Sequence, residues 1–153
     1  MLTHRAKYAF KALLHLARHA GEGPIQVRAI AAAEGIPQKF LEGILADLRR
    51  QGLVHSKSGK GGGHTIARDP QVITVLMVIR AIDGPVAPLP CLSQTAYARC
   101  ADCRDEGSCA TRQLFARLHQ QSLELMAATT IAAACAECAA SGAALKGPVG
   151  ACR

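Results

Sequence analysis

Four cysteines lie close together in the second half of this 153-residue sequence: Cys91, Cys100, Cys103 and Cys109, all within 19 residues. Thiolates are common ligands of iron–sulfur clusters and of structural zinc. Disulfides are rare in a reducing cytosol, so such a group in a cytosolic chain indicates metal or redox chemistry. The segment reads as an irregular loop, which lets several ligands converge on one centre. We therefore expect these four residues to form a metal site.

The residues leave two kinds of metal centre open. An iron–sulfur cluster, 2Fe–2S or 4Fe–4S, is the preferred interpretation, and zinc is the alternative. A second pair, Cys135 and Cys138, could complete a four-cysteine zinc site with Cys100 and Cys103. Cys135 and Cys138 fall in an alanine-rich stretch with strong helical preference. We expect them to be helix-packing residues.

The charge distribution indicates a polyanionic partner. Residues 1–69 carry 11 Lys and Arg against 5 Asp and Glu, a net charge of +6, whereas residues 70–153 have a net charge of +1. A basic half joined to a near-neutral half suggests a polyanion-binding module attached to a second element. Aromatic residues, on which single-stranded bases stack, are scarce, with no Trp, 2 Tyr and 3 Phe. Double-stranded DNA is therefore the favoured partner.

The elements that position these residues are mostly helices. Apolar spacing and capping residues predict helices over residues 3–19, 26–34, 37–51, 72–82, 111–128 and 131–140. Gly35 is a natural left-handed cap between the second and third helices, so the pair has a helix-turn-helix arrangement. Two short strands, 53–55 and 64–67, flank a basic, glycine-rich tip. A hairpin directly after a helix-turn-helix is a wing.

The third helix is the expected recognition helix, because such a helix enters the major groove with the polar face of its first turns. Gln38 can bind adenine, Lys39 can reach guanine or phosphate, and Glu42 can accept from cytosine. The predicted DNA-binding residues are Arg28, Gln38, Lys39, Glu42, Arg49, Arg50, Lys57, Lys60, Gly61, Gly62 and His64. Any one of these charges could instead belong to the solvated face of a helix; their combination with a basic wing favours DNA.

Several segments together resemble one known family. They are Gly35-Ile36, Phe40-Leu41-Glu42, the sequence LRRQGLV at 48–54, the wing sequence GKGGG at 59–63, and Cys91 soon after an apolar helix. Over about residues 1–130 the chain is similar to the winged-helix transcriptional repressor family of IscR, NsrR and RirA. The resemblance implies a homodimer, joined through the long helix after the cysteine loop. It also implies that two winged heads bind a pseudo-palindromic operator in double-stranded DNA.

The resemblance further implies an iron–sulfur cluster held by three cysteines of the loop, and Cys91, Cys103 and Cys109 match those positions best. Some members take a fourth ligand from a histidine three residues after the last cysteine, where this chain has Arg112. Other members use an acidic residue or a histidine in the first helix, where this chain has lysines. Cys100 is the local substitute and would make an all-cysteine site.

These inferences define an expected organisation. The fold class is mainly α, a winged helix-turn-helix with a two-stranded β wing and a long C-terminal dimerisation helix. The expected parts are a DNA-binding domain at 1–83, a cysteine-rich metal-binding loop at 84–109, a dimerisation helix with a following short helix at 110–140, and a flexible tail at 141–153. No apolar run is long enough to span a membrane and no signal peptide is recognisable, so we expect a cytoplasmic protein without membrane contact.

The expected function is a DNA-binding transcriptional regulator, a repressor, whose operator affinity depends on an iron–sulfur cluster that senses iron, redox state or nitric oxide. The cluster would order the loop beside the dimerisation helix and so fix the separation of the two heads. Two alternatives remain: a winged-helix regulator with structural zinc and no sensing, and a small iron–sulfur redox protein. No nucleophile–base pair or carboxylate dyad supports an enzyme.

Overall fold

Helices dominate the computed structural model, which describes residues 3–101 and 103–140. The elements are α1 His4–Arg18, α2 Val27–Glu34, α3 Gln38–Arg50, β1 Val54–Lys57, β2 Gly63–Ile66, α4 Val75–Ile82, the 3-10 helix η1 Pro90–Leu92, α5 Ala110–Ala128 and α6 Ile131–Ala140. The predicted mainly α fold with a two-stranded wing is confirmed. The predicted tail, 141–153, lies outside the described residues.

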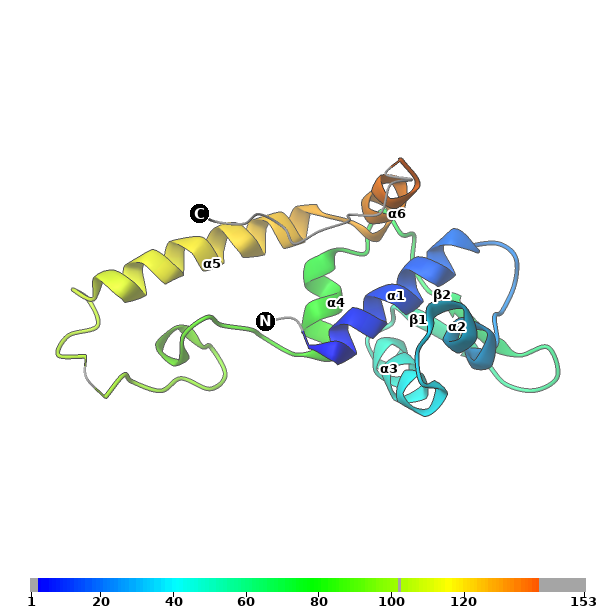
Figure 1. The fold of residues 1–153 in the computed structure, drawn as a ribbon, viewed down its shortest axis with the longest axis horizontal. Coiled ribbons are helices and arrows are strands. Elements are labelled where there is room, and N and C mark those ends of the chain that lie inside the picture. The colour runs from blue at the N-terminus through cyan, green and yellow to red at the C-terminus, as the bar shows by residue number, and fades with distance from the viewer. Residues whose placement is uncertain (1–2, 102, 141–153) are drawn as a thin grey trace.

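We define the head as α1–α4, the hairpin and α6, and helices α1, α2 and α3 supply most of its core (Figure 1). The Thr3 side chain caps α1 by accepting a hydrogen bond from the Ala6 amide at 3.1 Å. Apolar residues at helical spacing, such as Leu13 of α1 and Leu45 of α3, are fully buried in one shared cluster. Gly35 has a φ of 64° and ends α2 in the left-handed conformation. The predicted helix-turn-helix is therefore confirmed.

The wing is attached to the head by a backbone bridge. β1 and β2 pair in antiparallel register, with Val54 opposite Ile66. Beyond this pairing, the Ile25 amide donates to the His64 carbonyl at 2.9 Å and the His64 amide donates to the Ile25 carbonyl at 2.8 Å. A Cβ atom on Gly63 would lie 2.5 Å from the Ile25 oxygen, so this close approach requires glycine.

Helix α4 starts later than its sequence predicts. We expected residues 72–82, but the helix begins at Val75 because the Thr74 side chain caps it and accepts a hydrogen bond from the Met77 amide at 3.2 Å. Val72, expected inside the helix, is 56% exposed.

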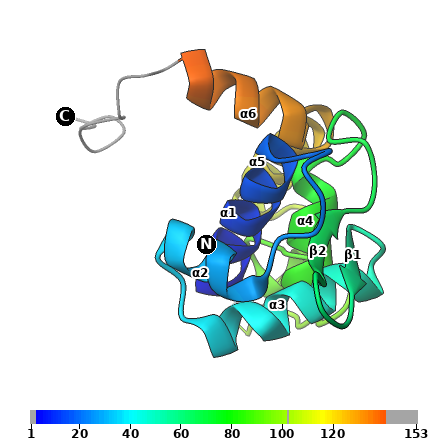
Figure 2. The ribbon, with the colours of Figure 1, turned by 90° about the vertical axis from the view of Figure 1, so that its right-hand side faces the viewer.

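Helix α6 returns to the head after α5 (Figure 2). Ile131 is completely buried in the core, and its amide donates to the Ile73 carbonyl at 2.8 Å. Thr74 and Thr130 form a β-bridge beside it. Cys135 packs against the same core, as its predicted helix-packing role requires.

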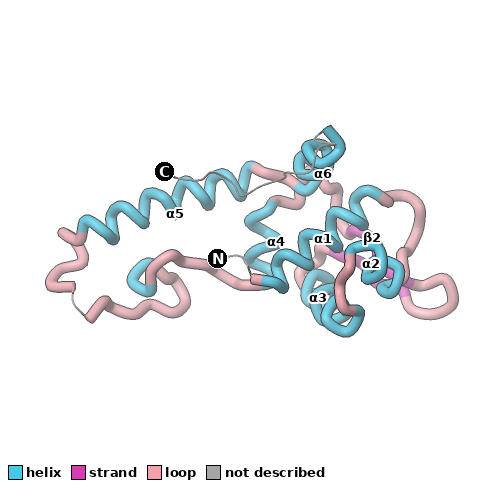
Figure 3. The backbone as a smooth tube through the Cα atoms, in the orientation of Figure 1, coloured by secondary structure: helices cyan, strands magenta, loops and turns pink. Residues whose placement is uncertain are grey.

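Between Asp83 and Thr129 the chain makes an excursion away from the head (Figures 1 and 3). The excursion contains a long loop with η1 and then α5, whose 19 residues span about 28 Å. Helix α5 contacts α4 and η1, and none of its residues is buried. Of the helices in the described residues, none combines the length and apolar character needed to cross a membrane.

Candidate DNA interface and cysteine pocket

Helix α3 and the hairpin lie on the side of the head away from α6 (Figure 2). The side chains of Gln38, Lys39 and Glu42, in the first turns of α3, are all exposed. Gln38 Nε2 donates to Glu42 Oε1 at 2.9 Å, so these two polar groups satisfy one another in the absence of a partner. The arrangement presents donors and an acceptor on one accessible helix face, as reading of base edges in a major groove requires.

Asp47 links α3 to α1, and the sequence alone did not reveal this role of Asp47. Its carboxylate accepts from Arg5 of α1 and from Arg50 of α3. The Asp47 side chain is only 16% exposed, whereas that of Arg50 is 72% exposed. Arg50 was predicted to contact DNA, and the structure gives it an ion-pair partner within α3. The spacing of Asp47 and Arg50 was visible in the sequence, but the contact with Arg5 depends on the fold.

The predicted wing residues divide into exposed and packed positions. Lys57, Lys60 and Gly61 are exposed, as is Arg28 on α2. Gly62 is buried, and its amide donates to the Gly59 carbonyl at 2.9 Å, so this amide serves the turn of the wing.

His64 is the half-buried member of the predicted DNA-binding set. Its Nδ1 lies 2.9 Å from Ser56 Oγ across the hairpin. Burial, followed by the positive charge of Arg49, lowers the pKa of the His64 imidazole from its usual 6.5. The ring is therefore mainly neutral at pH 7. The same charge effect places Arg49, which is exposed at the end of α3, close to the wing.

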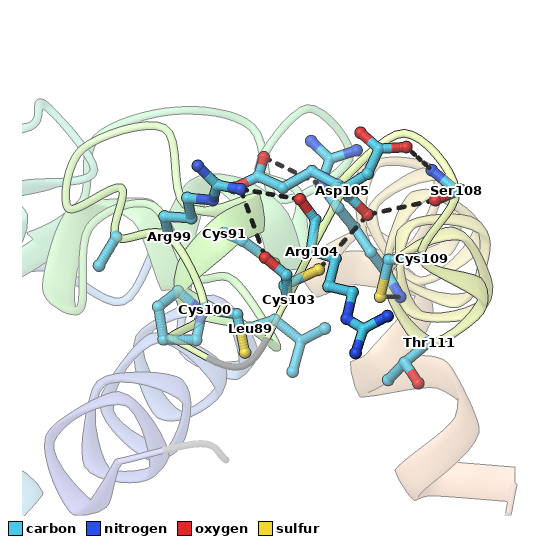
Figure 4. A pocket seen from close by; sticks show the side chains of 14 residues that line it. Leu89, Cys91, Arg99, Cys100, Cys103, Arg104, Asp105, Ser108, Cys109 and Thr111 are labelled. Carbon is cyan, nitrogen blue, oxygen red and sulfur yellow. Dashed lines mark hydrogen bonds and ion pairs between the residues drawn. The ribbon is translucent and has the colours of Figure 1, made fainter.

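The four predicted metal-site cysteines, Cys91, Cys100, Cys103 and Cys109, line one cavity of about 530 Å³ (Figure 4). We call this cavity the cysteine pocket. The thiols come from different parts of the excursion. Cys91 is buried in η1, Cys100 and Cys103 lie in the loop, and Cys109 is the N-cap of α5. The loop thus brings all four to the lining of one pocket.

Local hydrogen bonds shape the loop around this pocket. The Asp105 carboxylate accepts from the Gly107 amide at 3.1 Å and from the Ser108 amide at 3.0 Å. The Ser108 side chain and these amides lower the pKa of the Asp105 carboxyl. Arg99 Nη2 donates to the carbonyls of Cys103 and Arg104 at 3.3 and 3.0 Å (Figure 4). These contacts position Cys103 and Cys109, which flank the turn at residues 105–108.

The thiols of the pocket influence one another. Partial burial raises the pKa of the Cys103 thiol, and hydrogen bonding to Cys109 and the proximity of Cys109, Cys100 and Glu106 add to this effect. Three thiols and the Glu106 carboxyl thus lie close together. A cation bound among them would favour the thiolate and carboxylate forms.

Four thiols are the donor type of iron–sulfur clusters, and in this pocket they are not gathered around one ion. Each Zn–S bond is about 2.3 Å long, so thiolates around one zinc ion lie about 4 Å apart. In the described part of the chain, no group of three or more His, Cys, Asp or Glu side chains is placed to hold one ion. A cluster distributes its thiolates over several irons and accepts a wider spacing. Cys135, a member of the alternative zinc set, is not a pocket residue; its Sγ lies 3.9 Å from the Leu14 carbonyl in the head.

Helix α5 exposes an apolar face along its length. Leu114, Phe115, Leu118 and Leu125 are between 37% and 69% exposed. An unpartnered stripe of this kind on a 19-residue helix is unusual for a solvated surface.

Comparisons with known proteins cover the head, the pocket and α5 together. The model of the Rrf2 family, described as an iron-dependent transcriptional regulator, matches residues 2–137. An rrf2-like HTH-type transcriptional regulator of Rhodobacter capsulatus is 43% identical over 134 residues, 86% of this chain and 89% of that protein. IscR of Photobacterium profundum is 36% identical over 114 residues, 74% of this chain and 63% of that protein. The structure of CymR, the global cysteine regulator of B. subtilis, has a TM-score of 0.74 and 26% identity, and covers 89% of this chain and 96% of that chain.

Proposed function

Because this chain belongs to the Rrf2 family of iron-dependent transcriptional regulators, we propose that it is a repressor whose operator affinity is controlled by an iron–sulfur cluster bound in the cysteine pocket. The resemblance stated from its motifs is confirmed. The chain is a transcriptional regulator and not an enzyme. The alternative of a small iron–sulfur redox protein is set aside.

The DNA-contacting part of the proposal rests on the exposed polar face of α3 and the basic wing. Gln38, Lys39 and Glu42 would contact base edges, while Lys57 and Lys60 would contact phosphates. Arg49, in the last turn of α3, acts electrostatically on His64 of the wing. The remaining predicted residues, Arg28, Arg50, Gly61 and Gly62, would contribute to the phosphate contacts or to the shape of the wing. Each neutralised phosphate adds about 0.9 to the slope of log K against log salt.

One observation carries the cluster part of the proposal: four thiols from separate segments line a single pocket. Cys91, Cys100, Cys103 and Cys109 would hold the cluster, which supplies a redox-active and labile centre when bound. The protein's own contribution is mechanical. With these four residues held together, η1, the loop and the first turn of α5 are fixed relative to one another. Loss of that restraint frees the loop beside α5, and a bias of a few kcal/mol between two arrangements is enough to change operator affinity.

The restraint on α5 would affect DNA binding through a dimer of the chain. We propose that the exposed apolar face of α5 packs on the same face of a second copy, which sets the spacing of two heads on a pseudo-palindromic operator. A change at the first turn of α5 then alters that spacing. The same face would otherwise remain in water at a cost in hydrophobic free energy.

The test compares Cys103→Ser with Cys135→Ser. Both substitutions replace a half-buried thiol, but only Cys103 lines the pocket. After anaerobic purification, the wild type and Cys135→Ser should show visible absorbance, iron and sulfide, and Cys103→Ser should lose them. Operator binding measured with and without the cluster should differ about tenfold or more in the wild type.

Three results would contradict the proposal. Retained colour, iron and sulfide in Cys103→Ser would remove the ligand assignment. Stoichiometric zinc without iron or sulfide in the wild type would favour the structural-zinc alternative. Equal operator affinity with and without the cluster would leave a regulator that senses by another route, as the similarity to the global cysteine regulator CymR allows.

A further inference from the structure

The first turn of α5 contains a buried hydrogen-bond donor without an acceptor. Arg112 Nε is buried and has no hydrogen-bond partner, and among the described residues it is the one side-chain nitrogen or oxygen in this condition. Its ion-pair partner is Glu106 Oε2 at 3.9 Å, which is beyond hydrogen-bonding distance. The other oxygen of Glu106 accepts from the Tyr97 hydroxyl at 2.6 Å. An unpaired buried N–H costs free energy, so its presence calls for an explanation.

Arg112 lines the cysteine pocket, and its main chain already contacts a sulfur there. The Arg112 amide donates to Cys109 Sγ at 3.4 Å. A guanidinium has five N–H donors, no acceptor, and stays protonated in proteins. Arg112 therefore cannot be an iron ligand. It can only donate hydrogen bonds and positive charge to an electron-rich group in the pocket.

The other charged groups around the pocket are engaged elsewhere or exposed. Arg99 donates to two loop carbonyls, and the Asp105 carboxylate accepts from the turn that follows it. Arg104 lines the same pocket but is exposed to solvent, where its charge is screened. Of the three arginines that line the pocket, Arg112 thus combines a buried side-chain donor with a main-chain hydrogen bond to a cysteine sulfur.

We propose that Arg112 is a positioning residue that donates a hydrogen bond from Nε to a sulfur of the cluster site, either a thiolate or an inorganic sulfide, and thereby favours its reduced state. The inference rests on the cluster proposed above. Reduction adds negative charge, and hydrogen bonds to sulfur together with nearby positive charge stabilise that charge. Arg112 would therefore set the potential at which the regulator responds.

The test measures the reduction potential of the reconstituted cluster in the wild type, Arg112→Leu, Arg112→Lys and Arg104→Leu. Arg112→Leu removes the buried donor, and Arg104→Leu removes one charge from the exposed rim of the same pocket. We expect Arg112→Leu to shift the one-electron equilibrium about tenfold toward the oxidised form, which is about 59 mV. Arg112→Lys keeps the charge without Nε and should fall between wild type and Arg112→Leu. Arg104→Leu should shift the equilibrium less than twofold.

Iron and sulfide content and the unfolding midpoint are measured on the same samples. Equal potentials in the wild type and Arg112→Leu, or equal shifts in Arg112→Leu and Arg104→Leu, would overturn the role of Arg112 and leave the cluster in place. Loss of the cluster from Arg112→Leu alone, with an unchanged unfolding midpoint, would support a contact with the cluster. A wild type that binds neither iron nor sulfide would overturn both this inference and the proposed function.

Discussion

His64, on the wing, makes the stability of the folded protein depend on pH. The imidazole is half-buried, bonded to Ser56 and near Arg49, and these surroundings lower its pKa. In the unfolded chain the same ring binds a proton near pH 6.5. The unfolded state therefore binds more protons than the folded state as the pH falls below 6.5, and the folded state loses stability in that window.

We predict that His64→Gln removes part of this pH dependence. Between pH 7.5 and pH 5.5 the free energy of unfolding should fall more in the wild type than in His64→Gln, as measured by urea denaturation. His55→Gln, at an exposed position on the neighbouring strand, is the control and should behave as the wild type. A proton titration of the His64 ring that gave a midpoint at or above 6.5 would contradict the argument.

At this scale the sequence identifies residues whose chemistry depends on local spacing. The four cysteines lie within 19 residues, and the structure brings them to one pocket. Arg112 was noted only as a missing ligand, because its burial depends on how the loop folds over α5. Asp47 was missed for a similar reason, since its partner Arg5 is 42 residues away.

At the scale of elements, two glycines of the DNA-binding region serve opposite purposes. Gly63 packs against the backbone of Ile25, where a Cβ would come within 2.5 Å of an oxygen. Gly43 lies exposed in the middle of α3, and a Cβ there would meet nothing within 4 Å. The first glycine is required by packing, whereas the second only adds flexibility to a helix.

Alanine substitution at the two positions should therefore have effects of opposite sign. Gly63→Ala should destabilise the protein by about 1–3 kcal/mol, because the hairpin must move away from the linker between α1 and α2. Gly43→Ala should stabilise it by about 0.5–1 kcal/mol through helix propensity. Urea unfolding curves of both variants provide the measurement. A neutral Gly63→Ala variant would show that the Ile25–His64 bridge does not hold the wing.

The elements themselves were largely predictable, and their ends less so. The helix-turn-helix and the hairpin followed from apolar spacing, Gly35 and a glycine-rich basic tip. The start of α4 was misplaced because Val72 continues the apolar run, while the Thr74 cap decides where hydrogen bonding begins. The return of α6 to the head could not be read from its alanine-rich sequence, since small residues pack on many surfaces.

At the scale of the whole molecule, the exposed apolar face of α5 is the contact that we propose between two copies of the chain. Leu118 is 48% exposed at the middle of this face. Ala127 is nine residues further on, two and a half turns of helix, and so lies on the opposite side of α5, also exposed. The two positions differ in whether a second copy would cover them.

Leu118→Glu should convert a dimer into a monomer in sedimentation experiments, because it would place two carboxylates in an apolar contact. Ala127→Glu should remain dimeric. Since two linked heads bind a palindrome far more tightly than one, Leu118→Glu should also lose on the order of 100-fold in operator affinity. A Leu118→Glu variant that remained dimeric would place the subunit contact elsewhere. The division into residues 1–83, 84–109 and 110–140 stays a proposal that this experiment addresses in part.

The Thr74–Thr130 bridge has a consequence for how such a protein can change over time. It joins the residue just before α4 to the residue just before α6, so the two ends of the stretch that contains α4, the loop and α5 are neighbours. Between them, α4 contributes Val78 to the core of the head, whereas the loop and α5, residues 84–128, contribute no residue to that core. Insertions, deletions or changes of metal ligand in the loop and α5 can therefore accumulate without unfolding the DNA-binding head. One scaffold can thus evolve to respond to new signals while it binds the same operators.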